Sequence, residues 1–396
     1  MQVEVVIVGA GMVGLALAKR LDQIGLKVAL VEKHVIDIDW PAGSLPMRVS
    51  AISPASQLLL EQLKVWPDIA PDAAPYENMR VWDAQTEASI TLSAEDIYQA
   101  HLGHIVANRS IQKRLYQAIE QTDVECFMPD QVTHLQAQAA RWQLGLSSGQ
   151  TIETALLIGA DGANSALRQQ VGIDCSMTFY QQKAIVAVVQ TELPHQSTAW
   201  QRFLPTGPLA FLPLSDPYHC SIVWRLEETH AESIEKLNDK SFCQQLAQAL
   251  QYKLGSIQLL TERVAFPLKH HHCRTYVKPH FALIGDAAHS IHPLAGQGVN
   301  LGFLDVQVLS RVMSDTLEKQ RPIGLLSDLN RYQQQRKWHN ETMLQSMTLF
   351  NALFKQTDSF SKMVRQFGVN QVDSCHALKK YFIEQATGST FLKEFR

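Results

Sequence analysis

The sequence predicts an α/β fold in which a doubly wound parallel sheet carries an inserted, mainly antiparallel β domain and is followed by helices. The first observation is an apolar strand at 3–8, a helix pattern from 12 to about 24 and a second apolar strand at 27–31. Two continuous apolar strands joined by a helix indicate neighbouring parallel strands covered on both faces. The second observation is alternation of β-forming residues at about 80–90 and again at about 178–224, which predicts an antiparallel sheet.

The other segments follow this plan. A polar, Pro-containing loop to Pro46 precedes a helical segment at about 54–63. Between the two β-rich parts we expect, in order, a helix near 110–120, an antiparallel strand pair near 132–146 and a strand at 155–158, and beyond Leu301 the pattern is mostly helical. The chain should therefore leave its first domain and re-enter it. The expected division is a discontinuous first domain (1–75, 100–175 and 276–345), a β-sheet domain (76–99 and 176–275) and a C-terminal helical region (346–396).

Composition excludes several classes of protein. With 396 residues, 46% hydrophobic and 18% charged, the chain is long enough for two main globular units and shows no sign of disorder. The formal net charge of -3 offers no broad attraction for nucleic acid. The six cysteines form no C-x-x-C pair, a pattern typical of neither a disulfide framework nor a zinc site, and a reducing cytosol fits best.

The N-terminal sequence runs straight into an apolar strand, so we expect no export signal and a cytoplasmic protein. No stretch reaches the roughly 18 uninterrupted apolar residues that span a bilayer, and any membrane contact, at the inner face, should be peripheral. Two histidine groups, His289 with His292 and the run 270–273, raise the question of a metal. We expect none, because the first pair lies inside a Gly-rich motif described below and the run 270–273 lacks a partner at ligand spacing.

A Gly-rich turn follows the first strand and opens the first helix. Gly9 permits the tight turn, Gly11 lets a pyrophosphate approach the backbone, and Gly14 permits close packing of helix on strand. Glu32, at the end of the second strand, is placed to accept hydrogen bonds from ribose hydroxyls and to repel a 2'-phosphate. The motif predicts a dinucleotide site suited to FAD or NAD, and the alternative is a turn of purely structural use.

A second motif lies far along the chain, where the apolar strand 282–284 ends in Gly285 and Asp286. An aspartate at this point can hold a hydroxyl chain such as the ribityl group of FAD, a contact that NAD does not need. In the segment that follows, Pro293 and Gly296 let the backbone approach a flat ring. A helix beginning near Gly298, with Val299 and Asn300, would point its backbone N–H groups at a flavin and stabilise negative charge on the reduced ring.

A third motif is the end of the strand at 155–158, where Gly159 and Ala160 lead into Asp161 and Gly162. Strands of a parallel sheet end at one edge, so this carboxylate should lie beside the cofactor crevice. Alone, the pair would indicate only a turn.

The three motifs, in this order and at these separations, resemble the class A flavin-dependent aromatic hydroxylases. The stretches 48–53, 101–106, 210–217 and 285–302 are similar to the ubiquinone-biosynthesis hydroxylases, and within them to those that act on position 6 of a 2-polyprenylphenol. The similarity covers most of the chain up to about Tyr332.

The resemblance implies which residues bind FAD. Gly9, Gly11, Gly14 and Glu32 would hold the adenosine diphosphate half, with Arg48 near the pyrophosphate. Gln112 would lie on the ribityl side and Asp286 at a ribityl hydroxyl. The Asp161–Gly162 motif would serve both FAD and the reduced nicotinamide cofactor, and the backbone 298–300 would face the flavin. Gly285, Pro293 and Gly296 belong to the same run.

The resemblance also implies the reaction. NAD(P)H would reduce FAD, O2 would give a flavin C4a-hydroperoxide, and this species would hydroxylate a 2-polyprenylphenol to the 2-polyprenyl-6-hydroxyphenol in ubiquinone biosynthesis. The protein mainly has to position the ring and exclude water. His104 is a candidate for assisting phenol deprotonation, with a packed or solvated histidine as the alternative.

The partners expected are the polyprenylated phenol, O2, a membrane surface, other ubiquinone-biosynthesis proteins and a second copy of the chain. Met343, Met347, Phe350 and Phe354 recur at helical spacing and could line an apolar cleft for the substrate tail, or equally form core or an oligomer interface. Three alternative functions stay open: hydroxylation at another ring position or of a soluble phenolic, a flavin oxidase or reductase, and a non-catalytic flavin-bound subunit of a biosynthetic assembly.

Overall fold

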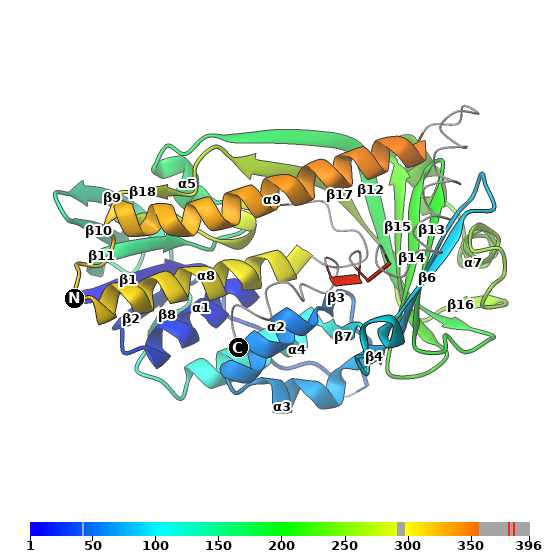
Figure 1. Ribbon diagram of the computed structural model, residues 1–396, viewed down its shortest axis with the longest axis horizontal. Helices are drawn as coiled ribbons and strands as arrows, with labels where there is room; N and C mark the ends of the chain where they lie inside the picture. Colours follow the sequence, from blue (N-terminus) through cyan, green and yellow to red (C-terminus); the bar gives the residue numbers. More distant parts are fainter. Residues whose placement is uncertain (42, 291–297, 356–378, 381–382, 385–396) are drawn as a thin grey trace.

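The computed structural model describes residues 1–41, 43–290, 298–355, 379–380 and 383–384. It contains a sheet around the N-terminal strand, a larger sheet at the other end of the long axis, and a small sheet between them (Figure 1). The α/β fold class predicted from the sequence, with a parallel-sheet part and antiparallel sheets, is confirmed.

The first sheet has the strand order β18-β19-β11-β1-β2-β8, with β9 and β10 extending it beside β11. Its strands are β1 (Gln2–Val8), β2 (Val28–Val31), β8 (Glu125–Phe127), β9 (Val132–Gln138), β10 (Arg141–Leu146), β11 (Thr151–Gly159), β18 (Val277–Lys278) and β19 (Phe281–Leu283). The pairs that β1 makes with β2 and β11, and those of β2 with β8 and β11 with β19, are parallel. Their carboxyl ends therefore meet at one edge.

Helices cover this sheet and connect its strands. They are α1 (Met12–Gln23), α4 (Asn108–Ile119), α8 (Gly298–Glu318) and α9 (Leu326–Lys355). Val5, Val6 and Ile7 have no exposed surface, as a strand buried on both faces requires. α1 packs against both α4 and α8, so two helices from opposite ends of the sequence lie side by side (Figure 1). The helix predicted to begin near Gly298 does begin there.

The larger sheet has the order β20-β17-β12-β15-β14-β13-β5-β6, with β16 beside β12. Its strands are β5 (Asn78–Asp83), β6 (Ser89–Ser93), β12 (Cys175–Thr191), β13 (Thr198–Leu204), β14 (Gly207–Pro213), β15 (His219–Glu227), β16 (Ile257–Leu259), β17 (Val264–Cys273) and β20 (His289–Ser290). The sequence predicted antiparallel pairing here, and one pair departs from it: β13 runs parallel to β5, because the chain reaches β13 through a long excursion and not through a hairpin.

Two helices inside the predicted β-sheet domain were missing from the sequence prediction. α6 (Glu228–Glu235) and α7 (Asp239–Ala249) cover the outer face of the larger sheet. Phe242 and Leu246 of α7 are fully buried in a cluster with Ile222 and Trp224 of β15. Asn238 caps α7, accepting a hydrogen bond from the backbone N–H of Ser241 at 2.8 Å.

The small sheet has the order β3-β7-β4 and lies between the two larger ones. Its strands are β3 (Val49–Ile52), β4 (Ala74–Tyr76) and β7 (Gly103–Ala107), and the helices α2 (Pro54–Gln62) and α3 (Trp66–Ile69) follow β3. Ala51 and Ile105 on this sheet share an apolar cluster with Ala199 and Leu212 of the larger sheet, and Ile383 joins the same cluster. This cluster joins the small sheet to the larger one.

Cys175, at the start of β12, forms a disulfide with Cys273, at the end of β17. The two residues lie opposite each other in an antiparallel pair. Their separation of 98 residues gave no local spacing signal, so the bond was not predicted.

None of the helices in the part of the chain that the structure describes has both the length and the hydropathy needed to cross a bilayer. The larger sheet draws its strands from 78–93 and 175–273, with β20 added. The division into three domains with the boundaries given above stays a proposal.

Candidate flavin site

A cavity of about 500 Å³ opens at the carboxyl edge of the parallel strands, a volume within the ordinary range for small-molecule sites. It lies between the first turn of the chain, the end of β2 and the end of β11. Its lining includes Gly9, Gly11, Glu32, Asp161 and Gly162. The structure thus brings together five predicted site residues from three separate stretches of sequence.

The three glycines of the first turn differ in what surrounds them. Gly9 has φ +110°, and a methyl group there would overlap the carbonyl oxygen of Ala160. A methyl group on Gly14 would overlap the carbonyl oxygen of Gly9. At Gly11, by contrast, no atom lies within 4 Å of the position of an added methyl group. Two glycines permit close packing and the third borders open space, as a pyrophosphate approaching the backbone requires.

Glu32 and Gln112 both hold the first turn at Ala10. The carboxylate of Glu32 accepts hydrogen bonds from the backbone N–H of Ala10 at 2.7 Å and of His34 at 3.0 Å. The side-chain amide of Gln112, on α4, donates to the carbonyl oxygen of Ala10 at 2.9 Å. Glu32 is therefore fixed at the rim of the cavity, and Gln112 lies at the Gly-rich turn itself.

Asp161 has one carboxylate oxygen engaged and one without a partner. Its Oδ2 accepts a hydrogen bond from the backbone N–H of Leu167 at 3.1 Å. Its Oδ1 is buried and has no hydrogen-bond partner among the residues that the structure describes. Gly162 follows with φ +78°, which turns the chain at this point. A buried, unpaired acceptor beside a cavity fits a ligand that carries hydroxyl or N–H donors.

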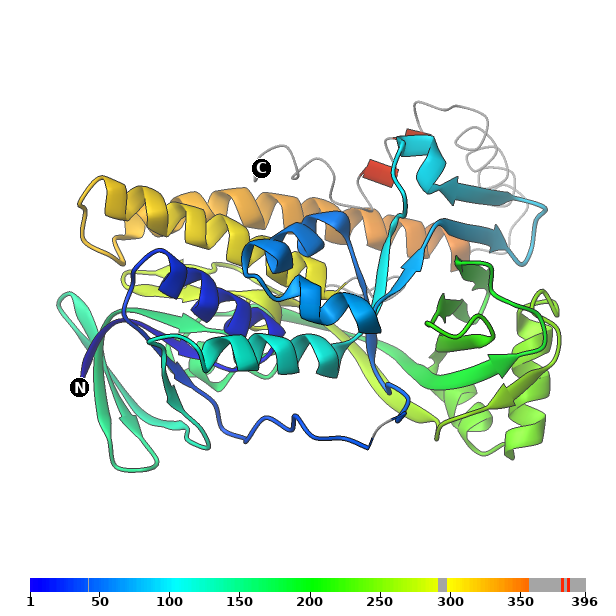
Figure 2. The ribbon, with the colours of Figure 1, turned by 90° about the horizontal axis from the view of Figure 1, so that it is seen from below.

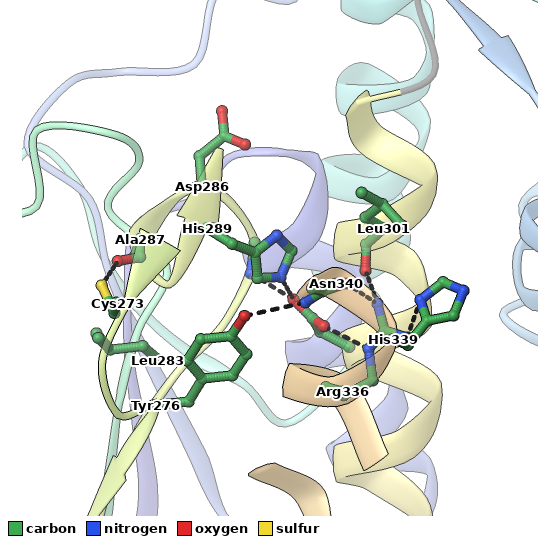
Figure 3. A network of polar contacts seen from close by, with 12 residues as sticks. Cys273, Tyr276, Leu283, Asp286, Ala287, His289, Leu301, Arg336, His339 and Asn340 are labelled. Carbon is green, nitrogen blue, oxygen red and sulfur yellow. Dashed lines mark hydrogen bonds and ion pairs between the residues drawn. The ribbon is translucent and has the colours of Figure 1, made fainter. Parts of the chain in front are cut away.

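The second motif forms a tight turn, a single 3₁₀ turn over Gly285–Ala287 with Gly285 at φ +55°. The side chain of Asp286 points outward from this turn and away from the polar groups behind it (Figure 3). Although water reaches the Asp286 carboxylate, the surrounding protein displaces enough solvent to raise its pKa, an effect that His289 and Arg48 oppose. This carboxylate is available to a hydroxyl group of a ligand.

The two motifs are close in space. Methyl groups of Val13, in the first turn of α1, approach Gly285 and also Gly302 in the first turn of α8. A methyl group on Gly302 would clash with Val13, so the start of α8 can lie this close to the start of α1 because Gly302 lacks a side chain. The starts of α1 and α8 and the turn that carries Asp286 therefore lie close together, as a long dinucleotide held at two points needs.

Asn300 has a structural role in addition to the one predicted for its backbone. Its side-chain amide donates to the carbonyl oxygen of Ala51 at 2.8 Å, and its side-chain oxygen accepts from the backbone N–H of Ser53 at 3.1 Å. The start of α8 is thereby tied to β3 and α2. Pro293 and Gly296 lie outside the described residues, and the predicted role of the backbone at Gly298 and Val299 stays a prediction.

Arg48 is exposed, and its guanidinium lies 5.2 Å from the ring centroid of Phe266 on β17. The charge of Arg48 is near enough to Asp286 to lower the pKa of that carboxylate. Arg48 therefore lies between the second motif and the larger sheet. Its predicted position near a pyrophosphate stays a prediction, and Phe266 is a neighbour that no sequence pattern indicated.

His104 packs against aromatic rings. On β7, Ile105 faces the larger sheet while His104 contacts the ring of Trp66 edge-on at 5.0 Å and that of His101 at 4.2 Å. Burial, and then the proximity of His101, lowers the pKa of His104 to about 4. A neutral, packed ring that faces away from the larger sheet fits the packing alternative better than proton transfer.

Comparison with known proteins adds to this geometry. The FAD binding domain family matches residues 2–347. The chain is 37% identical over 388 residues to the 3-demethoxyubiquinol 3-hydroxylase of Escherichia coli (strain K12), covering 97% of this chain and 98% of that protein. It is 34% identical over 434 residues to the ubiquinone biosynthesis monooxygenase COQ6, mitochondrial, of Danio rerio, covering 97% of this chain and 89% of that protein.

Solved structures agree on the fold. The p-nitrophenol 4-monooxygenase PnpA of Pseudomonas putida DLL-E4 superimposes with a TM-score of 0.78 at 15% identity over 98% of both chains. PqsL of Pseudomonas aeruginosa, a probable FAD-dependent monooxygenase, gives 0.77 at 19% identity, covering 94% of this chain and 100% of that one. Since the sequence matches run almost from end to end, the chain belongs to the FAD binding domain family and, within it, to the ubiquinone-biosynthesis monooxygenases, FAD-dependent enzymes that hydroxylate aromatic rings.

Proposed function

We propose that this enzyme hydroxylates the ring of a polyprenylated phenol in ubiquinone biosynthesis, converting a 2-polyprenylphenol to the 2-polyprenyl-6-hydroxyphenol. The observation that carries the proposal is that the chain has both a cavity at Glu32 and Gly11 and an outward-pointing carboxylate at Asp286. It is supported by the similarity of almost the whole chain to ubiquinone-biosynthesis monooxygenases. NAD(P)H, typical of this family, is the expected reductant.

The residues present fit FAD, and we propose the following roles for them. The turn at Gly9, Gly11 and Gly14 receives the pyrophosphate with Arg48 nearby, and Glu32 binds the adenosine ribose. The remaining proposed contacts are Gln112, Asp161, Gly162, Gly285, Asp286, Pro293, Gly296, Gly298, Val299 and Asn300. When bound, FAD supplies the activation of O2, and every other task falls to the protein.

The first of these tasks is electrostatic. The N-terminus of α8, beginning at Gly298, carries backbone N–H groups and the positive end of the helix dipole. Placed at the flavin, it stabilises the negative charge of the reduced ring without moving. The Asp286 carboxylate accepts a hydrogen bond from the ribityl chain and so fixes the ring relative to that helix.

The second task is to orient the phenol and keep water away from it. The small and larger sheets share an apolar contact that includes Ala51, Ile105, Ala199 and Leu212, and Arg48 lies beside Phe266. We propose that the phenol ring binds between these two features. The chemistry requires no protein nucleophile. The phenol proton leaves to solvent or to a side chain of the pocket. His104 is the candidate for that side chain, but its ring packs on Trp66, which favours transfer of the proton to solvent.

The insoluble tail of the substrate requires an apolar path from a membrane surface. We propose peripheral contact at the inner face of the membrane, with other ubiquinone-biosynthesis proteins or a second copy of the chain as further partners. Of the residues predicted to line the path, Met343 is half-buried on α9, and the side chains of Met347, Phe350 and Phe354 lie outside the described set.

A second candidate is hydroxylation at another ring position. It is favoured by the relative from Escherichia coli, whose name describes a 3-hydroxylation of 3-demethoxyubiquinol. The two candidates need the same flavin site and differ only in how the ring is held, so the structure around FAD serves both equally.

Product analysis separates the two candidates. Purified protein with FAD, NADH or NADPH and ¹⁸O2 is given a short-chain 2-prenylphenol or the matching demethoxyubiquinol in detergent, and the products are identified by mass spectrometry. Incorporation of one labelled oxygen at position 6 of the phenol supports the first candidate, and labelling of demethoxyubiquinol alone supports the second. Oxygen consumption with hydrogen peroxide as the sole product for both substrates would overturn the proposal.

A further inference from the structure

Behind the outward carboxylate of Asp286 lies a second aspartate that is fully buried. Asp305, in α8, has no exposed surface. Its Oδ2 accepts hydrogen bonds from the backbone N–H of Gly285 at 2.8 Å and from Nε2 of His289 at 2.7 Å. Its Oδ1 accepts from Nε of Arg336 at 2.7 Å. One carboxylate therefore links α8, the turn that carries Asp286, and α9.

Arg336 is the partner in α9 and is also fully buried. Besides Asp305, its guanidinium donates to the carbonyl oxygen of Leu301 at 3.2 Å and to Oδ1 of Asn340 at 2.9 Å. Leu301 lies in the first turn of α8, so Arg336 holds the helix end nearest the second motif. Asn340 in turn donates to the hydroxyl of Tyr276 at 3.2 Å.

Burial alone would raise the pKa of Asp305, but His289 and Arg336 outweigh burial and hold that pKa below its usual value. Asp305 is thus ionised at neutral pH. A buried ion pair is weak support for stability, because the loss of hydration offsets much of the attraction. A pair that also holds the backbone of the Gly285 turn and of the first turn of α8 is better explained by positioning.

The Gly285–Ala287 turn is also held from its other side. Nε2 of His271 donates to the carbonyl oxygen of Asp286 at 2.8 Å, which fixes the proton on that nitrogen because a carbonyl only accepts. Nη1 of Arg168, in the short helix α5 (Ala166–Gln170) that follows the Asp161 motif, donates to the carbonyl oxygen of Ala287 at 2.8 Å. Side chains thus fix the N–H of Gly285 and the carbonyls of Asp286 and Ala287, while the Asp286 side chain faces outward.

We infer that Asp305 and Arg336 are positioning residues for the flavin: together they fix the Gly285–Asp286 turn and the first turn of α8 in the geometry that receives the ribityl chain and the ring. This inference rests on the proposed flavin contacts of Asp286 and α8, and it is independent of which phenol is hydroxylated. Neither residue has exposed surface, so each would act through the backbone that it holds.

The same two helices supply a matched control. Asp315 in α8 and Arg331 in α9 form an ion pair at 2.6 Å that is partly exposed, ten residues beyond Asp305 in α8 and five residues before Arg336 in α9. The test variants are Asp305→Asn, which keeps shape and removes charge, and the milder Arg336→Lys. The control variants Asp315→Asn and Arg331→Lys make the same chemical changes in a pair that only joins the helices.

Two measurements are made on each variant. Hydrogen–deuterium exchange of the FAD-free protein reports on peptides covering 284–290 and 298–303, and fluorescence titration gives the Kd for FAD. For Asp305→Asn and Arg336→Lys we expect at least tenfold faster exchange in these peptides and at least a tenfold higher Kd, with a shifted absorption spectrum of the bound flavin. For the control variants we expect changes of less than twofold.

The inference is overturned if the test variants melt earlier but keep wild-type exchange at 284–290 and wild-type Kd, since the pair would then only stabilise the helices. If Asp305→Asn does not fold, Arg336→Lys still decides between these outcomes. Asp286→Ala is the separate check on the underlying site. An unchanged Kd in that variant would refute the proposed flavin contact, and the exchange data would still report whether Asp305 fixes the turn.

Discussion

The contrast between Gly11 and Gly14 gives the sharpest prediction. A methyl group on Gly11 meets no protein atom within 4 Å, whereas one on Gly14 overlaps the carbonyl oxygen of Gly9. Gly11→Ala should therefore leave the folded protein intact and damage only the binding of FAD. Gly14→Ala should damage the fold itself, because the helix must move away from the strand.

The magnitudes follow from the backbone. Gly11 is the N-cap of α1 with φ -69° and ψ 174°, a conformation that alanine adopts without strain. Alanine lowers the conformational entropy of the unfolded chain relative to glycine, which stabilises the folded protein by about 0.4–1 kcal/mol. Alanine is also a weaker N-cap residue than glycine, which destabilises the folded protein by a few tenths to about 1 kcal/mol. These terms nearly cancel, so the melting temperature without FAD should stay within about 2 °C. The methyl group obstructs the pyrophosphate, and a tenfold loss of affinity corresponds to about 1.4 kcal/mol.

The assay compares thermal unfolding of the FAD-free variants with their Kd for FAD from fluorescence titration. Gly11→Ala should give a normal melting temperature and a Kd raised at least tenfold. Gly14→Ala should melt well below the wild type, since overpacking typically costs about 1–3 kcal/mol or more. A Gly11→Ala protein that binds FAD with wild-type affinity would refute the assignment of the open space at this turn to the pyrophosphate.

Three further predictions concern charge, pH and redox state. Glu32→Gln should raise the Kd for FAD about tenfold, because hydrogen bonds from ribose hydroxyls to a neutral amide are weaker than those to a carboxylate by about 1–2 kcal/mol. A change below twofold in the same titration would contradict this. Burial lowers the pKa of His271 and His272 to about 4 in the folded protein, below the value of about 6.5 in the unfolded chain. The stability that these neutral rings contribute is therefore fully present above about pH 6.5. As the pH decreases below about 6.5, the free energy of unfolding falls by up to about 1.4 kcal/mol per pH unit for each histidine. Denaturant unfolding between pH 7.5 and 5 should show this loss, with a shallower slope in His272→Gln. Reducing the bond between Cys175 and Cys273 should cost about 2–4 kcal/mol, seen as earlier unfolding with dithiothreitol in the wild type and no response in Cys175→Ser.

Much of the parallel-sheet part could be predicted from the sequence, because its signals are local. The strand 3–8 is a continuous apolar run, Gly25 ends the first helix, and Pro54 follows the N-cap Ser53 of α2. Gly298 was identified as a helix start and is one. In each case the residue that decides the structure lies within the element it decides.

What escaped prediction depends on residues far apart in the sequence. The parallel pairing of β13 with β5, the disulfide between Cys175 and Cys273, and the contact of Arg48 with Phe266 have no local pattern. Asp305 did leave a signal, an acidic residue among Phe303, Leu304 and Val306 on a helix that is otherwise apolar there. Such a residue either breaks the pattern by chance or has a buried partner, and only the fold showed that partner to lie in α9.

The length of α9 bears on how the enzyme exchanges its ligands. Its 30 residues extend about 45 Å and run along most of the long axis, from β18 of the first sheet to β13 of the larger one (Figure 1, Figure 2). β12 and β17 bridge the same span as a long antiparallel pair closed by a disulfide. The helix α9 and the cross-linked pair of β12 and β17 thus both connect the two ends of the molecule. We therefore expect cofactor and substrate to enter by the movement of loops and side chains, with the distance between the two sheets unchanged.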